Sequence, residues 1–169
     1  MEKIAVISSE SFNQLYKHSK AEKKDINHII KRLAKLLSNT HCELGIIAGE
    51  EVSLEVAKLY DRNSGGEVHV FCPKNYEFKY ESLIDKKTEA KSFSEVHQKL
   101  SEWCNKIIVL GVSASVFSTL GLLRLRKDDV EVLVLKELIS KPLHTELKES
   151  INHVKEVKNI YEMEKEIKW

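Results

Sequence analysis

Short apolar runs alternate along this chain with longer segments whose apolar positions recur every three or four residues. The short runs predict buried strands at residues 3–8, 44–48, 68–72, 106–110 and 130–135. The longer segments predict helices at residues 21–37, 52–60, 93–104 and 113–126. Strands that are apolar without alternation are typical of a parallel sheet covered on both faces. Because parallel crossovers are right-handed, we expect an α/β fold: a doubly wound, mostly parallel, Rossmann-like sheet with helices on both faces.

The segment 74–92 departs from this alternation. Tyr76, Phe78 and Tyr80 alternate with charged residues, which predicts a flap or a short edge strand. Lysines beside aromatic rings can hold and stack nucleic-acid bases. The acidic residues of the same segment argue against a nucleic-acid partner.

The end of the chain, from about residue 143 to 169, predicts one long charged helix. Its apolar residues recur at near-seven spacing, at Leu147, Ile151, Val154 and Tyr161. These side chains either pack across the sheet or contact a partner. An assembly protein, for example a homodimer with a vestigial cleft, is therefore one of the functions to test.

Composition and charge narrow the class of protein. The 169 residues suit a single domain, 1–169, and the hydrophobic fraction of 42% provides a full core. The formal net charge of +1 gives no field that would recruit nucleic acid or a membrane. Met1 runs directly into a strand pattern and no stretch of about 18 apolar residues occurs, so we expect a cytoplasmic protein without a membrane partner. Lysine outnumbers arginine and is matched by glutamate, a balance often found in heat-adapted proteins.

The cysteines and histidines give no sign of a metal or a cofactor. Cys42, Cys72 and Cys104 are odd in number and far apart, which predicts buried small side chains rather than disulfides or a metal pair. The seven histidines lack the spacing of a zinc site. Neither Gly-x-Gly-x-x-Gly nor a Gly-Lys-Ser/Thr loop is present, which excludes ordinary dinucleotide dehydrogenases and P-loop hydrolases.

The candidate site lies in the loops that follow the strands. Residues 109–121 read VLGVSASVFSTLG, so a buried strand runs into a glycine and then into small hydroxyl residues. In open α/β sheets, ligands bind at this edge, where helix N-termini attract anions and small residues allow close approach. Ser113 also suits a helix N-cap. The ligand-binding candidates are Ser8, Ser9, Gly49, Glu50, Lys74, Asn75, Gly111, Ser113, Ser115 and Thr119.

Glu50 and Glu51 limit the charge of the expected ligand. Acidic side chains stabilise a helix N-terminus, but they also occupy the place where a phosphate would need free N–H groups. They repel a ligand that carries several negative charges. The same two carboxylates could instead hold ribose hydroxyls, or one of them could act as a general base if burial raised its pKa.

Four segments, IAVISS, LGIIAGEE, GGEVHVFCPKN and VHQKLSEWCNKIIVLG, carry a resemblance to a known group. In their order they resemble the SLOG superfamily, over residues 3 to about 147. That superfamily comprises the LOG-type, lysine decarboxylase-like phosphoribohydrolases, the molybdenum-cofactor carrier proteins and the Rossmann domain of DNA-processing protein A. The resemblance implies a Rossmann-like fold and a ligand at the strand ends.

The chain also departs from the LOG-type enzymes that it resembles. Their Pro-Gly-Gly-x-Gly-Thr-x-x-Glu signature, which binds phosphate and supplies the catalytic glutamate, is replaced by residues 111–119, GVSASVFST. Their glycine pair after the second strand corresponds here to Gly49 and Glu50, and their helical arginine is missing beside His97. The resemblance therefore implies a degenerate member whose catalytic positions are empty.

These observations favour a non-catalytic protein that binds a nucleotide or a nucleotide-derived small molecule. The alternative enzyme is a nucleoside-monophosphate phosphoribohydrolase in which Glu50 or Glu51 replaces the missing glutamate, with Glu50 as the first candidate. The second alternative is the assembly protein considered above.

Overall fold

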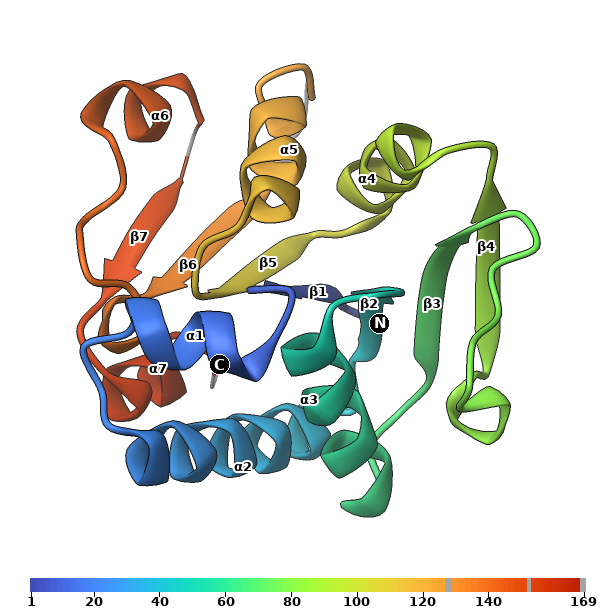
Figure 1. Cartoon of the computed structure of the whole chain (residues 1–169), viewed down its shortest axis with the longest axis horizontal. Helices are drawn as coiled ribbons and strands as arrows, with labels where there is room; N and C mark the ends of the chain where they lie inside the picture. The colour runs from blue at the N-terminus through green and yellow to red at the C-terminus, as the bar shows by residue number, and fades with distance from the viewer. Residues whose placement is uncertain (127–128, 152, 168–169) are drawn as a thin grey trace.

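The computed structural model describes residues 1–126, 129–151 and 153–167 and contains one seven-stranded sheet (Figure 1). The strand order is β4-β3-β2-β1-β5-β6-β7, and every pair of neighbouring strands is parallel. The strands are β1 (Lys3–Ser8), β2 (Glu43–Ile47), β3 (Val68–Pro73), β4 (Lys86–Ala90), β5 (Lys106–Leu110), β6 (Glu131–Leu135) and β7 (Val154–Val157).

Helices cover both faces of this sheet. The helices are α1 (Phe12–His18), α2 (Lys23–Thr40), α3 (Glu51–Arg62), α4 (Phe93–Trp103), α5 (Ala114–Leu123), α6 (Thr145–Ser150) and α7 (Ile160–Ile167), with short 3-10 turns η1 (Glu81–Leu83) and η2 (Lys136–Leu138). Figure 1 shows α1, α2, α3 and α7 on one face and α4, α5 and α6 on the other. The predicted α/β class and doubly wound arrangement are confirmed.

The sequence pattern follows from this layering. β1 lies at the centre of the sheet, and Ile4 to Ile7 have no exposed surface because helices pack on both sides. The apolar stripe of α2, which includes Ile26, Ile30 and Leu33, packs on one face of the sheet. Two separate apolar clusters result, one on each face.

The prediction of one long C-terminal helix is wrong. Residues 143–167 instead form α6, β7 and α7, and Trp169 lies outside the described residues. β7 is an edge strand that pairs only with β6, so its Lys155 is exposed and its pattern contains too few apolar residues to indicate a strand. The near-seven spacing relates side chains of three different elements, with Leu147 in α6, Val154 in β7 and Tyr161 in α7. It therefore gives no support to a helix that binds a partner.

The prediction for the segment after β3 is also wrong in detail. Tyr76 to Tyr80 form no strand; Phe78 is buried and Tyr76 partly buried against the core on the α3 side of the sheet. The edge strand is β4, which follows and pairs with β3. Its sequence, KKTEA, is polar because most of its side chains remain exposed at the edge of the sheet. Helix α1, in which Leu15 is buried and Phe12 and Tyr16 pack partly buried against the core, was not predicted at all.

Other expectations concern cysteines, membrane spans and metals. Cys42, Cys72 and Cys104 are buried, as predicted. Within the described residues, no helix has the length and apolar character needed to cross a membrane. The same part of the chain contains no group of three or more His, Cys, Asp or Glu side chains placed to hold a metal ion.

Candidate functional site

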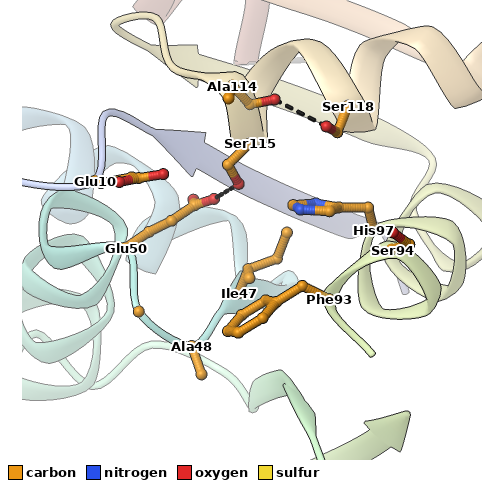
Figure 2. A pocket seen from close by; sticks show the side chains of 11 residues that line it. Glu10, Ile47, Ala48, Glu50, Phe93, Ser94, His97, Ala114, Ser115 and Ser118 are labelled. Atoms are coloured by element: carbon orange, nitrogen blue, oxygen red, sulfur yellow. Dashed lines mark hydrogen bonds between the residues drawn. The ribbon is translucent and has the colours of Figure 1, made fainter. Parts of the chain in front are cut away.

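A cleft of about 470 Å³ lies at the carboxyl edge of the sheet, where β1 has β2 on one side and β5 on the other (Figure 2). At this position the chain connections turn in opposite directions, which leaves a crevice between the loops of an α/β sheet. We call it the strand-end cleft. It is lined by Glu10, Ile47, Ala48, Gly49, Glu50, Phe93, Ser94, His97, Ala114, Ser115 and Ser118.

Glu50 forms the polar centre of the strand-end cleft. It occupies the N-cap position of α3 and is 3% exposed. Its Oε1 accepts hydrogen bonds from the Ser8 N–H (3.1 Å) and the Ser53 hydroxyl (3.0 Å). Its Oε2 accepts one from the Ser115 hydroxyl at 2.6 Å. Glu50 thus connects the end of β1, the first turn of α3 and the first turn of α5.

The environment of Glu50 changes its acidity. Burial raises the pKa of this carboxyl to about 7, although the hydrogen bonds from Ser115, Ser8 and Ser53 lower it. Near neutral pH the side chain can therefore both hold and release a proton. A buried carboxyl of this kind is a candidate binding or acid–base group.

Below the cleft, serine hydroxyls hold the backbone of the strand ends. The Ser113 hydroxyl donates to the Ser8 carbonyl (3.2 Å) and accepts from the Val116 N–H (3.1 Å), so Ser113 is the predicted N-cap of α5. The Ser53 N–H donates to Ser8 Oγ at 3.1 Å, so the Ser8 hydroxyl accepts a hydrogen bond from the first turn of α3. These buried hydroxyls are used within the protein and do not line the cleft.

Two glycines have the positive φ that the strand-end turns require. Gly49 has φ +94° and lines the cleft with its backbone. Gly111 has φ +93°, and a Cβ there would lie 2.3 Å from Ser9 Oγ and 2.9 Å from Leu15 Cδ1. Gly111 therefore allows the loop after β5 to pass close to Ser9.

His97 forms the opposite wall of the cleft and was missed by the sequence analysis as a site residue. Figure 2 shows His97 and Glu50 directed into the cleft from opposite sides, with the Phe93 ring between the two walls. His97 Nδ1 lies 3.0 Å from Thr119 Oγ1, and burial lowers the pKa of the imidazole. Phe93 and His97 are four residues apart on α4, so they share one face of that helix. That spacing is the signal that could have indicated them.

The predicted site residues divide into three groups. Gly49, Glu50 and Ser115 line the cleft. A second group is buried beneath it: Ser8, Ser9, Gly111, Ser113 and Thr119. Lys74 and Asn75 are exposed in the turn after β3 and do not line the cleft.

The charge of the cleft limits what it can bind. Among the described residues that line it, Glu10 and Glu50 are acidic and none is lysine or arginine. The first turn of α5 contributes Ala114 and Ser115, and a helix N-terminus favours an anion. The arrangement suits a ligand with many hydrogen-bonding groups and at most one phosphate.

Comparisons with solved structures agree on the fold, although no protein-family model and no curated protein sequence matches the chain. The protein TM1055 superposes with a TM-score of 0.73 at 15% identity, covering 99% of this chain and 98% of its own. The molybdenum cofactor carrier protein from Chlamydomonas reinhardtii gives a TM-score of 0.69 at 13% identity, with 98% and 95% covered. The chain has the fold of this carrier protein.

The same fold extends to a DNA-processing protein. DNA processing protein A from Streptococcus pneumoniae superposes with a TM-score of 0.63 at 12% identity, and the match covers all of this chain but 62% of that protein. Two of the groups named from the sequence therefore share this fold, which confirms the resemblance at the level of architecture. The strand-end cleft lies at the carboxyl edge of the sheet, where open α/β sheets bind ligands.

Proposed function

We propose that this chain binds a nucleotide or a nucleotide-derived small molecule in the strand-end cleft and does not convert it chemically. The observation that carries the proposal is the cleft itself, which combines the open backbone of Gly49 with the side chains of Glu50, His97 and Ser115. Carboxylate, imidazole and hydroxyl groups suit the hydroxyls of a sugar and the polar edges of a base. The carrier proteins of the same fold are named for a small molecule that they bind.

The absence of the family's catalytic signature supports binding without conversion. Residues 111–119 supply serines where the LOG-type enzymes have glycines and a glutamate. Ser113 directs its hydroxyl to the Ser8 carbonyl rather than into the cleft. The loop therefore lacks both the glycine-rich phosphate cradle and the catalytic carboxylate of those enzymes.

Thermal unfolding with a panel of nucleosides, nucleoside monophosphates and nucleoside triphosphates tests the proposal. A ligand at one hundred times its Kd stabilises the folded chain by about 2.7 kcal/mol. For a chain of this size that raises Tm by roughly 5–10 °C. No rise with any member of the panel at millimolar concentration would contradict the proposal.

A matched pair of variants locates the binding site. Ser118 and Ser150 are both exposed, and each hydroxyl donates to the carbonyl four residues earlier in its helix. Only Ser118 lines the strand-end cleft. We expect Ser118→Phe to fill the cleft and weaken ligand binding at least tenfold, while Ser150→Phe leaves it unchanged. Equal effects of the two substitutions would place the ligand elsewhere.

A second function, phosphoribohydrolase activity, is favoured by the position of Glu50. A buried carboxyl with a pKa of about 7 that faces the cleft can act as a general acid or base. This function predicts that the chain releases free base from AMP or a related monophosphate, and that Glu50→Gln abolishes the release. Absence of base release across purine and pyrimidine monophosphates would exclude it.

A further inference from the structure

A second cavity of about 200 Å³ adjoins the strand-end cleft. The two hollows share Gly49 and Glu50. The second one lies under the segment after β3 and is lined by the rings of Tyr76, Phe78 and Tyr80. We call it the aromatic cavity. It has no part in the function proposed above.

Gly49 and Tyr76 form the junction between the two hollows. The Tyr76 hydroxyl lies 3.6 Å from the position that a Cβ on Gly49 would take, so Tyr76 lies against the Gly49 backbone that the two hollows share. The Tyr76 ring also contacts Phe93 edge-to-face, with centroids 6.3 Å apart and planes at 86°. Because Phe93 lines the strand-end cleft, this ring pair forms a wall that continues from one hollow into the other.

The side chains of the aromatic cavity select a chemical class. Glu50, Glu51 and Glu77 line it together with one lining cation, Lys79, so a phosphate is disfavoured there. Phe78 is 9% exposed, whereas Tyr80 is 41% exposed and carries the Lys58 ammonium over its ring, 3.7 Å from the centroid. A flat, uncharged ring that stacks on an aromatic side chain and donates N–H groups to carboxylates fits these surroundings.

We propose that the aromatic cavity is a base subsite, and that the ligand lies across Gly49 with its planar base beside Tyr76 and its sugar in the strand-end cleft. The ligand class is a nucleoside, or a nucleoside monophosphate, whose base carries an exocyclic amino group. This inference rests on the function proposed above. It adds the orientation of the ligand. With the base in the aromatic cavity, only the sugar end of the ligand reaches Ser115 and the first turn of α5.

Calorimetric titration with AMP and with ribose 5-phosphate, which lacks the base, tests the orientation. We expect the wild-type chain to bind AMP at least tenfold more tightly than ribose 5-phosphate, since stacking of one base on an aromatic ring provides a factor of that order. Tyr76→Leu keeps an apolar side chain but removes the ring, and should weaken AMP binding about tenfold. Tyr161→Leu, which removes an exposed ring on α7, should have no effect.

Each result of this titration decides between the two proposals. If AMP binds equally well to the wild-type chain and to Tyr76→Leu, the base subsite is refuted while the proposed function stands. If AMP does not bind but another nucleotide of the panel raises Tm, the same comparison is made with that nucleotide. Equal binding to the wild-type chain and to Tyr76→Leu then refutes the base subsite, and tenfold weaker binding to the variant supports it. If no member of the panel binds, both proposals fail. The Tm of Tyr76→Leu is measured as a control. If it equals the wild-type Tm, weaker AMP binding reflects a loss of affinity and not a loss of folding.

Discussion

The buried carboxyl of Glu50 should make the stability of the whole fold depend on pH. Burial raises the pKa of Glu50 from its ordinary value of 4.5 to about 7. The folded chain therefore holds this proton more tightly than the unfolded chain does. The resulting stabilisation is complete below pH 4.5 and is lost as the pH rises to about 7. At about 1.4 kcal/mol for each tenfold change in proton affinity, the whole effect is roughly 3 kcal/mol.

Glu50→Gln isolates this effect because glutamine cannot ionise. Its amide oxygen keeps the acceptor for the Ser8 N–H and the Ser53 hydroxyl, and its amide N–H group faces the Ser115 hydroxyl, which can accept. Between pH 5 and pH 8 we expect the wild-type free energy of unfolding to fall by about 2–3 kcal/mol relative to that of the variant. Glu51→Gln, at the exposed neighbouring position, should keep the wild-type dependence.

Urea unfolding at pH 5, 6, 7 and 8 measures the difference. Burial lowers the pKa of His69 and His97, so both stabilise the folded chain above pH 6.5 and lose this contribution as the pH falls. Because these histidines are present in both proteins, their effect cancels in the comparison. Parallel pH profiles for the wild-type chain and Glu50→Gln would refute the claim that the Glu50 carboxyl is desolvated in the folded state.

Three further predictions concern the loop after β5 and its helix. Gly111→Ala should destabilise the chain by about 3 kcal/mol in urea unfolding, because it combines a φ of +93° with a close contact to Ser9. Gly121→Ala, within α5 and with no atom within 4 Å of the added Cβ, should instead stabilise it by about 0.5–1 kcal/mol. Thr119→Val should cost about 1–3 kcal/mol, since it leaves the buried His97 Nδ1 without its partner. A Gly111→Ala protein as stable as the wild type, or a Thr119→Val protein that loses nothing, would contradict these contacts.

The sequence pattern was sufficient for the central strands and insufficient for the edges of the sheet. The strands β1, β2, β3, β5 and β6 are buried, so each is a continuous apolar run. β4 and β7 each pair with only one neighbour, and solvent-facing residues such as Lys86 and Lys155 interrupt their apolar pattern. Hydrophobic periodicity alone therefore could not distinguish β4 from a loop or β7 from part of a helix.

The candidate site likewise contains some residues that the sequence predicts and others that it does not. Gly49, Glu50 and Ser115 were predictable because each follows a strand, and the carboxyl ends of parallel strands share one edge of the sheet. Phe93 and His97 belong to α4, which reaches the cleft only through its packing against α5 and the sheet. No local pattern in the sequence fixes that packing.

The serine-rich corner after β5 shows how the fold constrains the ligand. The Ser113 hydroxyl satisfies the Val116 N–H at the start of α5, and the Ser8 hydroxyl satisfies the Ser53 N–H at the start of α3. One backbone donor at each of these two helix starts is thus already used within the protein, which leaves fewer N–H groups for a phosphate. Glu50 then adds a carboxylate at the same place. Under the proposed function, recognition would therefore depend on hydrogen bonds to a sugar and contact with a base, which favours nucleosides and their monophosphates over ligands with longer phosphate chains.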